Sequence, residues 1–247
     1  RGIIVINPSD GGWIDEEQVK ALFVQAGLEN WTQCGTDSIE LRNSLYGLMD
    51  EISSELESSK SAQLVVPVDQ HFNVKGIGLV AIGYVQSGTI KVHDELLLMP
   101  SEGPGAVKSL QVMDDDVSEA VAGDRVGIAL RNAKEEHLSG GSLVVHPPIE
   151  DKRAGISIEM ALDKHENSIL KLSQSPFQKR QLAIGDVVHA SVDLQFVVGR
   201  VKSIDGELIV EWESPLFIRK ENPPSVILAQ LDSKPRIMGS ATLTRLE

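Results

Sequence analysis

The stretch Val65–Ser101, VVPVDQHFNVKGIGLVAIGYVQSGTIKVHDELLLMPS, decides the fold. Short β-branched runs alternate with glycines, and turn signals recur about every 8–12 residues, which is typical of a sandwich or barrel rather than a helical fold. The later segment Ala122–Leu130 (AGDRVGIAL) opens with a turn and continues as a strand whose inward side chains alternate as Val126, Ile128 and Leu130. We therefore predict one small closed β-barrel over Val65–Val145.

The residues before this barrel have the pattern of an α/β domain. The run Ile3–Ile6 (IIVI) is typical of a strand buried on both faces. Asp15 is suited to cap a helix that Gly27 ends. A second helix is predicted from about residue 37 to 56, and its apolar side would consist of Ile39, Leu45, Leu48, Met49 and Ile52.

The residues after this barrel predict a second antiparallel barrel. Gly155–Leu162, Val187–Leu194 and Glu207–Trp212 alternate between apolar and polar side chains, and Asp205-Gly206 is a hairpin turn. The third domain would begin near Arg153. The fold class is therefore an α/β part followed by two antiparallel β-barrels, with domains at residues 1–60, 61–150 and 151–247. The serine-rich segment at 53–63 is interpreted as a helix end and linker.

Composition narrows the class of protein. Among 247 residues there is a single cysteine, Cys34, which favours a reducing, cytoplasmic setting. No apolar run is long enough to span a bilayer, so we expect no membrane partner. The net charge of −13 argues against broad nucleic-acid binding. Residues 151–247 carry thirteen acids and thirteen bases, which makes them the favoured face for RNA, although an evenly charged solvated surface gives the same count. Because the chain opens at Arg1 and runs directly into a strand, we expect it to start inside a longer protein.

The motifs of the barrel follow one another in a recognisable order. They are Pro67–Phe72, Lys75–Gly78, Gly88–Leu96 (GTIKVHDEL), Ser109–Gln111 and Ala122–Leu130. In order and spacing they resemble the second domain of translational GTPases of the elongation factor Tu type, and more closely that of the archaeal selenocysteine-specific elongation factor. The resemblance implies that residues 1–60 are the end of a G domain and that both barrels belong to an elongation factor.

In that family an Asn-Lys-x-Asp loop reads guanine. Asn7 and Asp10 match it, but Pro8 replaces the lysine and removes a cation, an apolar stem and a backbone donor. The following Ser-Ala-Lys-like segment appears only as Cys34-Gly35-Thr36. No Gly-x-x-x-x-Gly-Lys-Ser/Thr motif is present, so these residues cannot build a phosphate cradle. We expect no catalytic residue and no cofactor from this chain; GTP and Mg²⁺ would require an intact upstream G domain. A pseudo-GTPase is the alternative.

The resemblance also implies a pocket for the aminoacyl end of tRNA at the barrel's entrance, lined by Asp69, His71 and Phe72, with Arg125 as a neighbour. A phenylalanine can stack on a base, an acid can accept from an α-ammonium group, and His71 or Arg125 can favour an anionic side chain. The alternative is structural: Phe72 lies in the core, Asp69 caps a turn and Arg125 pairs with Asp124 or a neighbour. Leu79 departs from the threonine usual in the family.

The third domain of such factors grips the tRNA backbone. The candidate cations here are Lys179, Arg180, Arg200, Lys202 and Arg236. The expected partners are aminoacyl-tRNA and the ribosome, bound by a monomer in the cytoplasm. A platform for protein interaction without a tRNA ligand is the remaining alternative. No metal site is expected, because the six histidines lie far apart and the acids Asp114–Asp116 match a loop that is acidic in the family.

Overall fold

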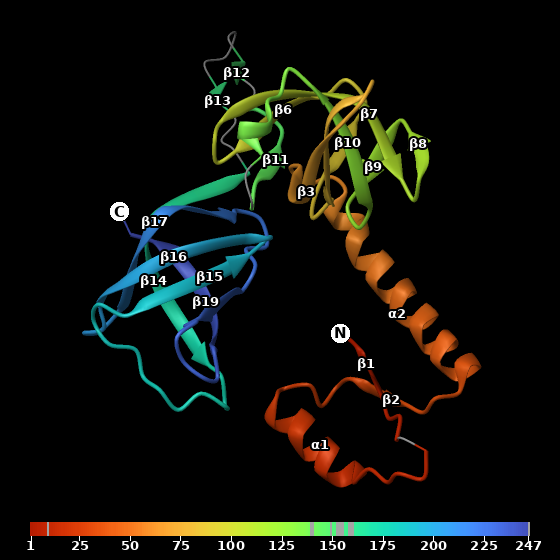
Figure 1. The fold of residues 1–247 in the computed structure, drawn as a ribbon, viewed down its shortest axis with the longest axis vertical. Helices are drawn as coiled ribbons and strands as arrows, with labels where there is room; N and C mark the ends of the chain where they lie inside the picture. Colours follow the sequence, from red (N-terminus) through yellow and green to blue (C-terminus); the bar gives the residue numbers. More distant parts are fainter. Residues whose placement is uncertain (9, 139–140, 149, 152–155, 158–160, 247) are drawn as a thin grey trace. The chain divides into compact units, whose positions relative to one another are not determined.

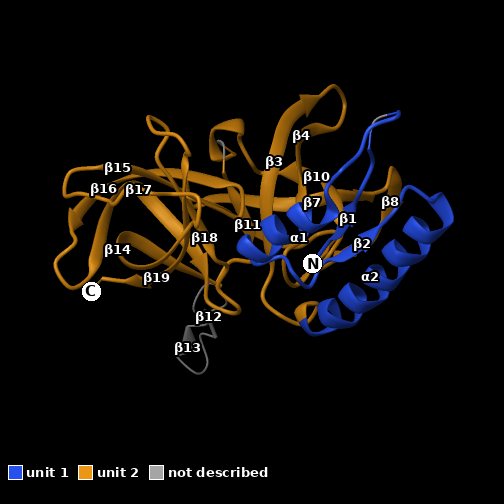
Figure 2. Cartoon of the chain, turned by 90° about the horizontal axis from the view of Figure 1, so that it is seen from below, with its two compact units in different colours: residues 1–58 blue, residues 59–247 orange. Residues whose placement is uncertain are grey.

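A computed structural model describes residues 1–8, 10–138, 141–148, 150–151, 156–157 and 161–246. The chain divides into two compact units, Arg1–Ser58 and Ser59–Glu247, coloured blue and orange in Figure 2. Each unit is described by itself. The expected strand at 155–162 and the expected domain start at Arg153 fall largely outside the described residues.

The first unit is a small α/β arrangement. Strand β1 (Ile3–Val5) pairs in parallel with β2 (Thr32–Cys34), and helices α1 (Glu16–Gln25) and α2 (Ser38–Ser59) complete it (Figure 1). Asp15 caps α1 as expected, since its carboxylate accepts from the N–H groups of Glu17 and Gln18. Asp37 does the same for α2. Gly27, with φ of 72°, follows the end of α1.

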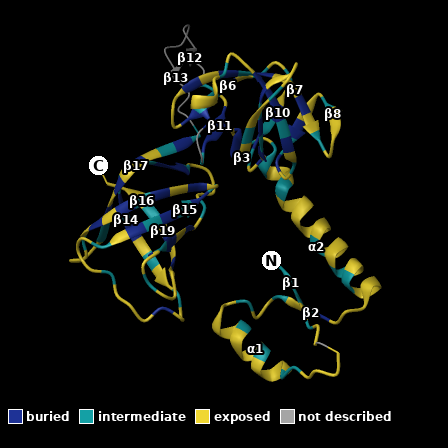
Figure 3. Cartoon of the chain, viewed as in Figure 1, coloured by how far each residue is buried: buried dark blue, intermediate teal, exposed yellow. Residues whose placement is uncertain are grey.

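The apolar side predicted for the second helix is not covered in this unit. Ile39, Met49 and Ile52 are 66%, 56% and 41% exposed, and Figure 3 shows α2 mainly in the colour of exposed residues. The helix is also longer than predicted, because it continues to Ser59. Periodicity thus identified side chains that share a face, but nothing among the described residues of this unit buries them.

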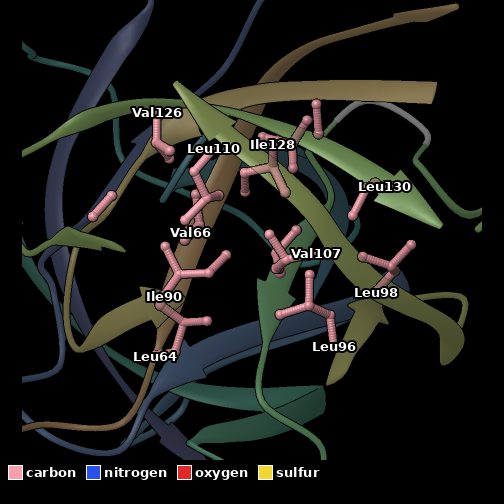
Figure 4. Packing of buried hydrophobic residues seen from close by; sticks show 14 of the residues in the cluster. Leu64, Val66, Ile90, Leu96, Leu98, Val107, Leu110, Val126, Ile128 and Leu130 are labelled. Atoms are coloured by element: carbon pink, nitrogen blue, oxygen red, sulfur yellow. The ribbon is translucent and has the colours of Figure 1, made fainter. Parts of the chain in front are cut away.

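The first barrel, barrel one, is a closed antiparallel sheet. Its six strands follow one another in the order β10, β4, β3, β11, β6 and β7, and a β10–β7 pairing closes the ring. The bounds are β3 Val65–Val74, β4 Gly78–Tyr84, β6 Glu95–Met99, β7 Gly103–Val112, β10 Arg125–Arg131 and β11 Leu143–Val145. The predicted inward residues Val126, Ile128 and Leu130 are buried. They pack with Leu64, Val66, Ile90 and Leu110 in one core (Figure 4).

Short elements complete barrel one. Strand β8 (Asp115–Val117) pairs with β7, β5 (Thr89–Lys91) pairs with β9 (Glu119–Val121), and η1 (Glu135–His137) is a 3-10 turn. Met113 and Asp114 both have positive φ and make a two-residue hairpin turn between β7 and β8. Asp115 and Asp116 therefore belong to a strand rather than to a loop. No acid or histidine cluster suited to a metal ion occurs among the described residues.

The second barrel, barrel two, closes in the order β14, β17, β16, β15, β18, β19. The bounds are β14 Leu162–Gln174, β15 Val187–Val192, β16 Gln195–Ser203, β17 Leu208–Arg219, β18 Val226–Ala229 and β19 Ile237–Arg245. The predicted turn at Asp205-Gly206 does join β16 to β17. Val187–Leu194 ends two residues early as a strand, because Asp193 and Leu194 have positive φ and form a hairpin turn to β16. Strands β12 (Glu150–Asp151) and β13 (Ile156–Ser157) pair with each other.

An apolar cluster joins the two barrels. Val65, Met99, Leu143 and Val145 of barrel one pack with Leu162 and Phe217 of barrel two. The buried side-chain amide of Gln195 holds the backbone of Phe217 from both sides: its Nε2 donates to the carbonyl at 2.7 Å, and its Oε1 accepts from the N–H at 2.9 Å. The shared cluster is thus fixed to the hydrogen-bonded frame of barrel two.

None of the helices in the described part of the chain is both long and apolar enough to cross a bilayer.

Candidate functional site

The loops that follow the two parallel strands meet in a cleft of the first unit. The N–H of Ile6 donates to the carbonyl of Cys34 at 3.1 Å, which draws the loop after β1 against the end of β2. Ligands of α/β domains bind at this carboxyl end of the strands. The cleft, of about 510 Å³, is lined by Ile6, Pro8, Gly12, Trp13, Ile14, Glu16, Lys20, Gln33, Cys34 and Gly35.

The predicted guanine-reading residues border this cleft without lining it. Asn7 and Asp10 are exposed, whereas Pro8 and Gly35 form part of the wall. Sequence reasoning missed Trp13 and Lys20, which also line the wall. Trp13 stands out only in the structure, where its side chain is 82% exposed, which is unusual for so large an apolar residue. The structure thus brings the two expected loops together but presents the two predicted side chains to solvent.

A β-bulge sets the direction of the barrel-one candidates. In the β3–β4 pairing Val68 faces Gly83 and Gln70 faces Ile82, so Asp69 is an extra residue on β3. Such a bulge leaves its residue outside the ladder and re-aims the side chain. Asp69 is exposed. The close approach of β3 to β4 beside this bulge depends on Gly83, where an added Cβ would lie 2.2 Å from the carbonyl oxygen of Pro67.

His71 and Phe72 lie on opposite faces of β3, because successive side chains of a strand alternate. His71 faces Ala81, which points into the core, and Phe72 faces Val80. Phe72 is 41% exposed, so it lies outside the core and is accessible to a stacking partner. The position that departs from the family pattern, Leu79, is 6% exposed and belongs to the core of barrel one.

Arg125 occupies the outer face at a different point along the sheet. Its guanidinium carbon lies 5.9 Å from the ring centroid of Tyr84, its cross-strand partner, within the range of a cation–π contact. The carboxylate of Asp124 instead accepts from the backbone N–H of Val121. Tyr84 lies four residues along β4 from Val80, the cross-strand partner of Phe72. At about 3.3 Å per residue, Tyr84 and Val80 are about 13 Å apart along the strand. Phe72 and Arg125 therefore lie apart on the outer face of barrel one, while His71 is on the opposite face of β3, so the four predicted residues do not form a single tight pocket.

The predicted cations of barrel two gather around the loops at one end of the barrel. Arg180 pairs with Asp186 at 3.3 Å, and Arg200 donates to the carbonyl of Gly185 at 3.0 Å in the same turn. Lys202 pairs with Glu211. Lys179 and Arg236 are exposed.

A buried glutamine ties two of these loops together. Gln178 is 7% exposed, and its Nε2 donates to the carbonyl of Pro235 at 2.7 Å. Its Oε1 accepts from the N–H of Arg180 at 2.9 Å. The loop that carries Lys179 and Arg180 is therefore fixed beside the loop that carries Arg236.

Comparison with known proteins identifies the class. Residues 78–145 match the family model of elongation factor Tu domain 2. The chain is 27% identical over 172 residues to the selenocysteine-specific elongation factor of Methanocaldococcus jannaschii, covering 70% of this chain and 36% of that protein. An uncharacterized protein of the same organism is 26% identical over 175 residues, covering 71% of this chain and 53% of that protein. The chain is thus similar to translation elongation factors, and its match to elongation factor Tu domain 2 agrees with the order of the motifs.

Solved structures agree on the fold. The apo structure of translation elongation factor SelB from Methanococcus maripaludis has a TM-score of 0.76 and 22% sequence identity, covering 99% of this chain and 57% of that one. A bacterial selenocysteine-specific elongation factor has a TM-score of 0.73, also at 22% identity, covering 98% and 39%. Of the two curated relatives named above, the chain spans 36% of the selenocysteine-specific elongation factor and 53% of the uncharacterized protein.

Proposed function

We propose that this chain is part of a cytoplasmic elongation factor-like protein that binds aminoacyl-tRNA, the ribosome or both as a monomer, with a degenerate guanine-nucleotide site. The observation that carries the proposal is the outer face of barrel one, where Phe72, Tyr84 and Arg125 are exposed on paired strands. Aromatic rings and a guanidinium on one sheet face are suited to bases and to a charged acceptor end.

Phe72 provides the direct test of the aminoacyl-end contact. Base–aromatic stacking contributes about 1–3 kcal/mol, so Phe72→Ala should weaken binding of aminoacyl-tRNA about 5-fold to 150-fold. Ile77→Ala is the matched control, because Ile77 is similarly exposed, at 46% against 41%, and lies at the turn after the same strand. Binding is measured by fluorescence anisotropy with aminoacylated and deacylated tRNA. Equal affinities for Phe72→Ala and the unchanged protein would contradict the role of Phe72.

The cations of barrel two are proposed to hold the RNA backbone. Arg200→Glu and Arg236→Glu should each weaken binding of every tRNA alike and reduce the salt dependence by about one phosphate contact. Lys91→Glu is the control, since Lys91 is a cation of barrel one that pairs with Glu119 at 3.2 Å. If only a protein partner binds, and neither arginine variant alters RNA binding, the interaction-platform alternative is favoured instead.

The degenerate nucleotide site is tested with labelled guanine nucleotide at micromolar concentration with Mg²⁺. We expect no saturable binding by this chain, because Pro8 replaces the lysine and Asn7 and Asp10 do not line the cleft. Saturable binding by folded protein would show that the loop tolerates Pro8, and the pseudo-GTPase alternative would then fall.

A further inference from the structure

A second pocket opens at the end of barrel two opposite to the cation cluster. It has a volume of about 630 Å³ and is lined by Asp163, His165, Ile218, Arg219, Lys220, Pro223, Leu243, Thr244 and Arg245. These residues come from the start of β14, the ends of β17 and β19 and the loop after β17. Arg236, by contrast, precedes β19, whose beginning pairs with the far end of β14. The two basic regions are therefore separate sites.

A chain of buried hydrogen bonds runs from the core to this pocket. The indole Nε1 of Trp212 donates to Ser168 Oγ at 2.8 Å, and Ser168 Oγ lies 3.1 Å from His165 Nδ1. Because an indole N–H can only donate, the hydroxyl accepts it, and its own proton can be donated to Nδ1. When the hydroxyl donates in this direction, the neutral imidazole carries its ring proton on Nε2. In that tautomer His165, which is 2% exposed and lines the pocket, has an N–H donor for a bound group.

His165 stays neutral near pH 7. Burial lowers the pKa of its imidazole from the ordinary 6.5, and the positive charge of Arg245 lowers it further, while Asp163 opposes both. The ring therefore donates a hydrogen bond without adding a charge.

The charges at the pocket leave a positive excess. Arg219 forms a two-pronged pair with Asp193 at 2.8 and 3.3 Å, and Lys220 lies 3.7 Å from Asp163. Arg245 is the third cation of this group. Three cations and two acids give a local net charge of +1, in a chain whose net charge is −13. An anion would be drawn to this point against the general repulsion of the protein.

We propose that this pocket binds a phosphate group. Arg245 and Lys220 would supply charge-assisted donors, while the His165 Nε2–H and the Thr244 hydroxyl would supply neutral ones. A tetrahedral phosphate has enough oxygen acceptors for donors that converge from several strands. The pocket is larger than one phosphate, and Ile218, Pro223 and Leu243 provide apolar walls, so the phosphate is carried by a larger group such as a nucleotide or an RNA strand. This inference does not depend on the proposed tRNA contacts of either barrel.

The test uses inorganic phosphate and nuclear magnetic resonance of the whole chain. Saturable phosphate binding should shift the His165 ring signals and, through Ser168, the Trp212 indole N–H signal. Arg245→Gln should weaken this binding tenfold or more, while Lys91→Gln, which removes an equal charge from barrel one, should leave it unchanged. His165→Gln, which retains a neutral donor, should weaken it less than Arg245→Gln. No shift up to tens of millimolar phosphate, or equal shifts in the Arg245→Gln protein, would overturn the proposal.

Two further ligands separate the sources of the phosphate. If a short RNA hairpin shifts the same His165 and Trp212 signals and inorganic phosphate competes with it, the site holds an RNA backbone phosphate. If a mononucleotide competes and the hairpin does not, the site serves a small phosphorylated molecule. Both results support a phosphate site, and neither requires that Phe72 or Arg236 contact tRNA.

Discussion

Replacing Gly83 with alanine should weaken barrel one, whereas the same change at Gly127 on the neighbouring strand should not. An added Cβ at Gly83 would lie 2.2 Å from the carbonyl oxygen of Pro67 and 3.0 Å from Val66 Cγ1. At Gly127 the nearest atoms, on Gln111, are 3.9 Å away, an ordinary contact. Neither glycine has positive φ, so the comparison isolates the close approach of two strands.

The magnitude follows from what must move. The contact at Gly83 is about 1 Å too short, and the obstructing atom belongs to the backbone of β3, so the strand itself has to shift. Overpacking of this kind costs about 1–3 kcal/mol. The shift also strains the ladder where Val68 faces Gly83, at about 1 kcal/mol for one weakened hydrogen bond. We expect Gly83→Ala to lower the free energy of unfolding by about 2–4 kcal/mol, and Gly127→Ala to change it by less than about 1 kcal/mol.

Amide hydrogen exchange at Val126 and Ile128 reports barrel one alone, since both residues lie on β10 in its core. A loss of 2 kcal/mol should accelerate their exchange about thirtyfold. Exchange rates in Gly83→Ala that stay within about twofold of the unchanged protein would refute the claim that this glycine sets the spacing of β3 and β4. Such a result would also remove the structural basis for the bulge that turns Asp69 outward.

Three other predictions concern single interactions. Burial lowers the pKa of His165 in the folded chain, so below pH 6.5 the unfolded chain binds a proton that the folded chain does not. The free energy of unfolding should therefore fall as the pH drops below 6.5, by at most about 1.4 kcal/mol per pH unit. In urea denaturation at a series of pH values, His165→Gln should reduce this pH dependence. Ser168→Ala leaves the buried Trp212 N–H without its acceptor and should cost about 1–3 kcal/mol in the same assay, while a change below about 0.5 kcal/mol would mean that the hydroxyl is dispensable. Asp15→Ala should destabilise helix α1 by about 1 kcal/mol, because it removes the N-cap, and the Gln18 amide should then exchange faster. Asp10→Ala is the control, since Asp10 is not the cap residue of this helix.

Local patterns predicted much of the fold. The alternation of Val126, Ile128 and Leu130 identified inward positions correctly, and Asp205-Gly206 marked a real hairpin. Both signals act over a few residues, where backbone geometry and side-chain alternation are set by neighbours. The turn at Asp193-Leu194 was missed because it has positive φ without a glycine. There the carboxylate of Asp193 is held by Arg219 on a distant strand, which no local pattern reveals.

The sites were harder to predict than the strands. The motif order placed Asp69, Phe72 and Arg125 on one barrel, but the bulge at Asp69 depends on how close β4 can approach, which the sequence does not state. The pocket at the end of barrel two joins His165, Lys220 and Arg245, three segments that only barrel closure brings together. A periodicity or a short motif cannot report such a convergence.

The side-chain amide of Gln195 pairs with the Phe217 backbone as a peptide group of a neighbouring strand would. This amide offers the same donor and acceptor as a peptide group and pairs with both polar atoms of the Phe217 backbone. A glutamate there would have the same length but would replace the N–H donor with a buried negative charge, and an asparagine would fall one methylene short. The position should therefore accept almost no substitute, and a change there would disturb the apolar cluster in which Phe217 packs against the other barrel.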